Sequence, residues 1–200
     1  MYCKQATCEA KDSMNRFVKS KKGLSTVVTT LIILVVAVLL ASIVTFYAIN
    51  VVTTRVQEES LQIFKQHLWH NGTTFAEGAF LIINTGGRDV VLDKISVRGQ
   101  ESPWASIYYN KTTNTISQDL FFIVPNLNGS LLGQSVTLGT STYPLTQASD
   151  DLILRSGWSM IVYVTNPDSI SVSDIGVTVG FTVFTANAQY YKECNVGASV

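Results

Sequence analysis

The sequence is poor in the residues that disulfide frameworks and metal sites need. Its 200 residues include only three cysteines and two histidines. Cys3 and Cys8 have no second pair at metal-ligand spacing, and Cys194 stands alone near the C-terminus. We therefore expect no metal and no cofactor. Cys194 is interpreted either as an idle buried thiol or as one half of a bridge between subunits.

The motifs of the common catalytic sites are also missing. The sequence contains no GxSxG motif and no glycine-rich phosphate loop, and His67 and His70 are remote from any candidate nucleophile loop. These two histidines could share a metal if they lay on a helix, but ordinary packing or surface positions explain them better. Asp150 and Asp151 lack the D-x-D-G loop of a calcium site, which favours a solvated turn. We predict no catalytic residues, and a protein that is not an enzyme.

Charge is absent from one long stretch and unevenly divided around it. No charged side chain occurs between Lys22 and Arg55. Residues 1–22 hold six Lys/Arg and two Asp/Glu, a net of +4, and the remainder holds eight and twelve, a net of −4. Positive residues before an apolar segment orient the N-terminus toward the cytoplasm. The acidic remainder has no basic cluster, which argues against nucleic acid as a partner.

The uncharged stretch has the composition of a membrane-spanning helix. Thirteen of the residues from Leu31 to Asn50 are Leu, Ile, Val or Phe, which favours insertion by about 4 to 8 kcal/mol. No glycine or proline occurs between Leu24 and Asn71, and the pattern becomes amphipathic after Val52. The sequence therefore predicts one helix over residues 24–71, with a stop at Asn71-Gly72.

Lys21, Lys22 and Gly23, followed by Leu24 and the apolar helix, resemble the class III signal of archaeal type IV pilins and archaellins. In that family a prepilin peptidase cuts after the glycine. The resemblance implies a removed leader over residues 1–23 and a mature chain that begins at Leu24. Met14 offers a second start and a shorter leader, and the sequence leaves both starts open.

The part over residues 72–200 is predicted to be an extracellular β-domain. Short runs rich in β-branched residues alternate with glycine, proline and asparagine turns, and seven or eight strands at this spacing suggest an Ig-like β-sandwich. The predicted fold class is therefore α+β: a long hydrophobic helix and an all-β, Ig-like sandwich of pilin-like or archaellin-like type. The expected strands cover 75–83, 90–97, 105–109, 120–124, 136–138, 152–154, 160–164 and 175–184.

Two further sets of residues are candidate sites. Ala37, Ala41, Thr45 and Ala48 recur at helical spacing, and small residues on one face let identical helices pack closely. The frequency of alanine in membrane helices explains this stripe equally well. The three sequons at Asn71, Asn110 and Asn128 lie in turn-like segments, where N-glycosylation is expected at one or more of them.

The family resemblance implies a structural function. It predicts a pilin subunit that polymerises through its apolar helix into a surface filament for adhesion, after starting as a precursor in the cytoplasmic membrane. The implied partners are copies of the chain itself, the membrane, a prepilin peptidase, an assembly ATPase with its platform protein, and an S-layer. The alternatives are an archaellin of a rotary filament, a minor pilin or stator component, and a membrane-anchored β-domain that binds a partner without polymerising.

Overall fold

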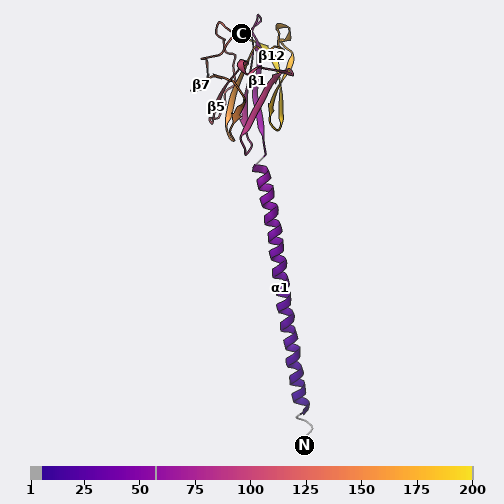
Figure 1. The fold of residues 1–200 in the computed structure, drawn as a ribbon. Coiled ribbons are helices and arrows are strands. Elements are labelled where there is room, and N and C mark those ends of the chain that lie inside the picture. The colour runs from indigo at the N-terminus through magenta and orange to yellow at the C-terminus, as the bar shows by residue number, and fades with distance from the viewer. Residues whose placement is uncertain (1–5, 57, 200) are drawn as a thin grey trace. The chain divides into compact units, whose positions relative to one another are not determined.

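The computed structural model describes residues 6–56 and 58–199, with side chains for 25–54 and 58–199 (Figure 1). The chain divides into two compact units, residues 1–54 and residues 55–200. Helix α1, which runs from Ala6 to Val56, makes up the first unit, and the second is a β-domain.

The polar side chains of α1 bond within the helix. Thr29, Ser42 and Thr45 donate their hydroxyls to the carbonyls of Ser25, Val38 and Ala41 at 2.8 to 2.9 Å. Asn50 likewise donates its amide to the Phe46 carbonyl at 3.0 Å. These groups therefore need no water as a partner, which is the condition for a helix in lipid.

The predicted helix over residues 24–71 is too long at its C-terminal end. Helix α1 ends at Val56, and strand β1 occupies Leu61–His70. Leu61 and Ile63 are buried two residues apart, and a bulge then shifts the alternation so that Leu68 and His70 are buried. A two-residue period broken by one bulge imitates helical spacing, and this explains the error.

The β-domain consists of twelve strands and two short 3₁₀ helices, Trp104–Ser106 and Val172–Asp174. Ten strands form one continuous sheet in the order β4-β3-β11-β12-β1-β2-β10-β5-β8, with β9 on β3, and β6 and β7 form a separate hairpin. The bounds after β1 are β2 Ala76–Asn84, β3 Val90–Val97, β4 Gln100–Glu101, β5 Ile107–Thr112, β6 Ser135–Leu138, β7 Ser141–Pro144, β8 Thr146–Gln147, β9 Leu152–Leu154, β10 Ser159–Thr165, β11 Thr178–Thr185 and β12 Gln189–Ala198.

The expected helix followed by a mainly β domain is confirmed. The two separate sheets expected of an Ig-like sandwich are replaced by a single curled sheet, because β12 pairs with β11 on one side and with β1 on the other. Side chains of β2 and β10 meet those of β3 and β11 in the main core, where the rings of Phe80 and Phe181 lie 5.0 Å apart. Sequence periodicity detects the alternation within a strand but does not show which strands pair with each other in the sheet.

A second core lies on the other face of β2 and β10. Leu81, Ile161 and Tyr163 pack there against Leu131 and Leu145 from the segment between β5 and β9. Every residue of β10 is buried, so this strand has protein on both faces. Residues 120–124, expected as a strand, form no strand and instead cover this second core.

Gly86 provides a direct test of packing against the backbone. A Cβ atom there would lie 2.7 Å from both the Glu58 carbonyl oxygen and the Ser60 nitrogen. Because backbone atoms cannot swing aside, Gly86→Ala should lower the free energy of unfolding by about 1 to 3 kcal/mol. Gly197→Ala is the matched control, since its nearest contact would be an ordinary 3.5 Å. Equal denaturation midpoints for the two variants would contradict this account.

Candidate functional site

One hollow of the β-domain is a slot between the first and last strands, which Figure 1 shows side by side. Strands β1 and β12 are parallel, but they pair only from Leu68 opposite Val196 to His70 opposite Ala198. Nearer their N-terminal ends no backbone ladder joins them within the described residues. Lys65, with φ of 52°, lies in the β1 bulge between Phe64 and His67, three residues before this ladder begins. A bulge bends its strand and disrupts pairing locally.

The backbone groups of both strands point into this slot. The Glu193 carbonyl accepts a hydrogen bond from Gln66 Nε2 at 3.2 Å, so the backbone of Glu193 faces β1. The Ser60 carbonyl accepts from the Thr85 amide on the opposite side of β1, at 2.9 Å. Because alternate residues of a strand face alternate neighbours, Leu61 and Ile63 face the slot from β1, and Tyr191 faces it from β12.

Side chains partly close the slot. It is lined by Glu59–Ile63 of the first segment and Tyr190–Lys192 of the last. Burial raises the pKa of Tyr190; a hydrogen bond from the Leu61 backbone opposes this shift, and Glu59 adds to it. The two side chains that reach across are therefore Tyr190, to Leu61, and Gln66, to Glu193.

Glu59 is fixed at the entrance to the slot. Its carboxylate accepts hydrogen bonds from the Thr185 hydroxyl and, at 3.0 Å, from Asn187 Nδ2. Tyr191 on the outer face covers Gly180 and donates its hydroxyl to Glu193 Oε1 at 2.9 Å. The rim thus has defined positions even where the two strands are unpaired.

A second feature is the outer strap, residues 117–124, which crosses the outer face of β1, β2 and β10. Lys65 Nζ donates to the Gln118 carbonyl, and His67 Nε2 lies 2.9 Å from Asp119 Oδ1. Partial burial would raise the pKa of Asp119, but the hydrogen bond and charge of His67 outweigh it and lower that pKa.

The middle of the outer strap is held by two buried groups. Tyr163 donates its hydroxyl to the Phe121 carbonyl at 3.0 Å, and Glu77 Oε1 accepts from the Ile123 amide at 2.9 Å. Glu77 is fully buried, and its Oε2 has no hydrogen-bond partner among the described residues. Burial raises the pKa of Glu77 to about 8, although the Ile123 hydrogen bond works against the shift. The carboxyl is therefore largely neutral at pH 7.

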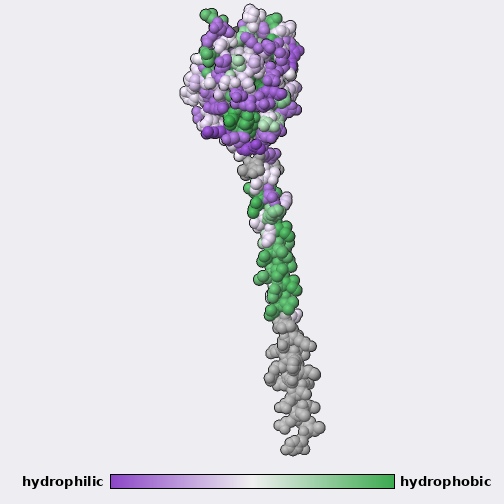
Figure 2. Space-filling model, viewed as in Figure 1, coloured by the Kyte–Doolittle hydropathy of each residue, from purple (hydrophilic) through white to green (hydrophobic). Residues whose placement is uncertain are grey.

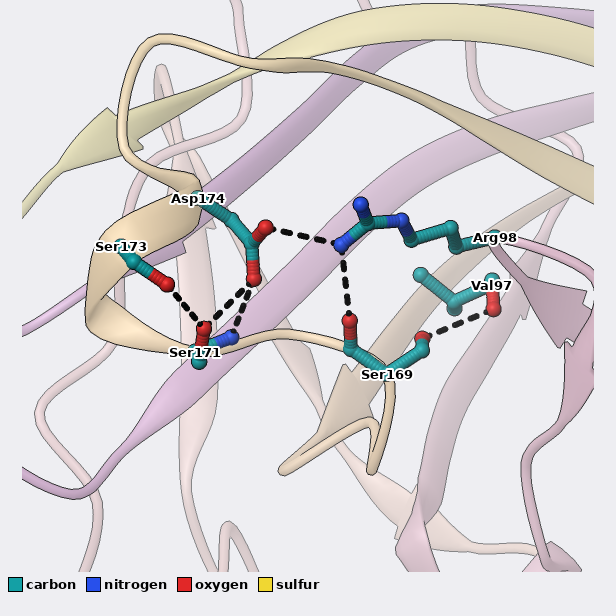
Figure 3. Close-up of polar contacts among 6 residues, drawn as sticks. All are labelled: Val97, Arg98, Ser169, Ser171, Ser173 and Asp174. Atoms are coloured by element: carbon teal, nitrogen blue, oxygen red, sulfur yellow. Dashed lines mark hydrogen bonds and ion pairs between the residues drawn. The ribbon is translucent and has the colours of Figure 1, made fainter.

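A third polar cluster, around Arg98 and Asp174, satisfies itself (Figure 3). Arg98 Nη1 lies 2.8 Å from Asp174 Oδ1, and Asp174 Oδ2 accepts from both the amide and the hydroxyl of Ser171. Hydrogen bonds from Ser171, followed by the contact with Arg98, lower the pKa of Asp174 to about 2. The cluster joins the turn after β3 to the 3₁₀ helix at Val172–Asp174, and we assign it a structural role.

The predicted cleavage residues Lys21, Lys22, Gly23 and Leu24 lie on the helical backbone of α1, but their side chains are outside the described residues. Cys3 lies outside the described residues altogether, and cleavage after Gly23 stays a prediction. The helix-packing stripe of Ala37, Ala41, Thr45 and Ala48 is exposed along α1.

The three sequons lie in different settings. The Asn71 side chain caps the turn before β2 by accepting from the amides of Thr73, Thr74 and Phe75. Asn128 is exposed in a turn. Asn110 lies within strand β5, not in the expected turn, and its amide donates to the Pro144 carbonyl at 2.7 Å. Asn71 and Asn128 are therefore the more accessible acceptors.

No group of three His, Cys, Asp or Glu side chains suited to a metal occurs in the part of the chain that the structure describes. His67 and His70 lie on a strand, so residues three apart face opposite sides. His70 is buried, and its Nδ1 accepts from the Gly72 amide at 3.0 Å. Burial raises the pKa of the Cys194 thiol to about 11, which disfavours a reactive thiolate.

No protein-family model matches this chain, and no curated protein matches it. Among solved structures, a chain described as "apo PmoF2 PCuAC domain" is similar over 70% of this chain and 94% of its own, with 15% identity and a TM-score of 0.39.

This result overturns the predicted function. That solved structure is described as a PCuAC domain and not as a pilin, so the prediction of a filament-forming pilin, archaellin or minor pilin is wrong by this comparison. A likeness with a TM-score of 0.39 assigns no ligand or activity to this chain either. The function must therefore be inferred from the residues of the chain itself.

Proposed function

We propose that the protein is a single-pass membrane protein that holds its β-domain outside the membrane as a binding module. The observation that carries this proposal is the apolar segment Ser25–Thr54, which is long enough to cross a bilayer and has none of its most apolar stretch buried. The six Lys/Arg among the first 22 residues support a cytoplasmic N-terminus and an external β-domain.

The exposure of this segment supports an anchor over the core helix of a water-soluble protein. Phe46 and Tyr47 are each 70% exposed and Leu39 is 57% exposed. Figure 2 shows green, apolar surface over much of the described part of the helix, interrupted by paler patches. An apolar helix of this length left in water would expose far more contiguous apolar surface than soluble proteins tolerate.

A binding function fits the β-domain better than catalysis. Its polar clusters either satisfy themselves, as Arg98 and Asp174 do, or hold the outer strap in place. The open feature is the slot between β1 and β12, which offers backbone and side-chain contacts but no nucleophile paired with a base among its lining residues.

Membrane extraction and protease protection test the proposal. The full chain, tagged at its C-terminus, should stay in the membrane pellet at alkaline pH. In intact cells external protease should digest the tag and the β-domain. Release of a shortened chain that lacks residues 25–54 would show a removed signal sequence instead, and protection of the tag would reverse the orientation. Either outcome would overturn the proposed function.

A further inference from the structure

We propose that the slot between β1 and β12 binds one extended strand of a partner protein, which runs antiparallel to both. The inference rests on the proposed function, because it names what the displayed domain binds. Strands β1 and β12 are parallel to each other, so an inserted strand forms either two parallel ladders or two antiparallel ones. Antiparallel pairing is the more stable per residue, and it sets the direction of the ligand.

The backbone that faces the slot lies outside the β1–β12 ladder on both sides. Leu61 and Ile63 face it from β1, and Tyr191 and Glu193 face it from β12, while the ladder covers only Leu68–His70 and Val196–Ala198. Unpaired edges of this kind are templates for strand addition. Because the slot offers such an edge on each side, an inserted strand would pair with β1 on one side and with β12 on the other.

Side chains now occupy the places that main-chain partners would take. Gln66 Nε2 donates to the Glu193 carbonyl at 3.2 Å, as the amide of an inserted strand would. The Tyr190 hydroxyl likewise meets the Leu61 backbone. Both side chains rotate without breaking any strand pairing, so an incoming strand displaces them at low cost.

The other edges of the sheet are protected. The sheet ends in β4 and β8, which have only two residues each. The remaining side of β3 is covered over three residues by β9, from Val90 opposite Leu154 to Leu92 opposite Leu152. Very short terminal strands are a common protection against unwanted pairing. In the described part of the domain, the slot is therefore a place where two backbone edges face each other.

The side chains of the slot indicate the kind of strand that fits. Leu61 and Ile63 are already packed in the main core, so the inward residues of the ligand must be small. Phe64 on β1 is 46% exposed and Tyr191 on β12 is 56% exposed, both on the outer face. An aromatic or large apolar residue that points outward would lie between them. The partner segment thus alternates small inward residues with at least one large outward residue.

Residue-resolved amide hydrogen exchange on the full chain in lipid nanodiscs tests the inference. The probe is the peptide Lys-Thr-Ala-Phe-Ala-Thr-Lys, and the control is the same peptide N-methylated at alternate residues. Without peptide, the amides of Ile63 and Tyr191 should exchange quickly, while that of Lys192, which faces β11, should be protected. Saturating peptide should slow exchange at Ile63 and Tyr191 about tenfold or more. The methylated peptide should bind at least about tenfold more weakly because it loses main-chain donors.

A matched pair of variants separates backbone from side-chain effects. Tyr191→Pro removes an amide that faces the slot, and Tyr191→Phe keeps both that amide and the aromatic ring. Only the proline variant should lose peptide protection, with exchange in β2 and β10 unchanged as the check of folding. If the proline variant does not fold, the two peptides still decide the question.

Two results would overturn the inference: no protection at saturating peptide, or equal binding of both peptides. Protection that grows with protein concentration in the absence of peptide would assign the slot to a second copy of the chain and overturn the partner-strand inference. Retention of the chain in the nanodisc is recorded in the same samples. Loss of peptide binding with retention intact therefore counts against the slot alone, while failure to incorporate counts against the proposed function.

Discussion

Glu77→Gln is expected to gain about 4 kcal/mol in free energy of unfolding over the wild type when the pH is raised from 5 to 8. The pKa of Glu77 is raised by burial from 4.5 to about 8 in the folded protein. Below about pH 4.5 the carboxyl is protonated in both states, so ionisation makes no difference to stability there. As the pH rises toward 8, unfolding releases its proton, so the wild type loses about 1.4 kcal/mol per pH unit. Glutamine has no proton to release and can still accept from the Ile123 amide.

Urea denaturation between about pH 4.5 and 9 measures this difference. The wild-type free energy of unfolding should fall relative to that of Glu77→Gln across the window from about pH 5 to 8, and the gap should stay constant above about pH 9. Glu101→Gln, in the exposed two-residue strand β4, is the control and should follow the wild-type curve. A parallel pair of curves for wild type and Glu77→Gln would show that the pKa of Glu77 is the same in the folded and unfolded states, and would contradict the effect of burial.

The double substitution Val36→Arg and Leu40→Arg should abolish stable membrane insertion. Both positions lie near the centre of Ser25–Thr54, on the same face of α1 and exposed. Each change replaces a residue that favours insertion by about 0.5 kcal/mol with one that opposes it by about 3 kcal/mol. The pair therefore costs about 7 kcal/mol, comparable to the gain from the entire segment.

Thr53→Arg with Thr54→Arg is the matched control. It adds the same charge at the end of the segment, where long cationic side chains reach the interface and the cost is small. Alkaline extraction should leave the control in the pellet and move the central double variant to the supernatant. Retention of both variants would mean that the segment is held by protein contacts and not by lipid.

The apolar helix was predictable because its signal is long and local. Residues 31–41 are apolar without exception, and no distant contact is needed to make them helical in lipid. Strand β3 was predicted with its observed bounds, Val90–Val97, and β9 with Leu152–Leu154. Both are short apolar runs bounded by turns, and the turn residues mark where each strand begins and ends.

The rest of the domain depends on contacts that no local pattern records. The sequence predicts helix where β1 lies because the bulge at Lys65 breaks the alternation of this strand. Strand β12 escaped prediction because Tyr191, Lys192 and Glu193 are exposed, so no apolar periodicity marks it. Residues 120–124 have the composition of a strand but form an irregular segment that covers the second core. The slot exists only because the first and last strands become neighbours. The pKa of Glu77 is raised only when the outer strap covers and buries its carboxyl group.

The pairing of β1 with β12 also sets an order of events during biosynthesis. Leu68 of β1 lies opposite Val196 of β12, so the first strand of the domain is completed by a residue 128 positions further along the chain, the difference between 196 and 68. Closing such a long loop is slow, and it cannot begin until β12 has left the translocation machinery. Until then β1 and β11 each present a free side to chaperones and proteases. Deletion of strand β12 should therefore yield a chain that inserts into the membrane normally but is degraded on the far side before its domain matures.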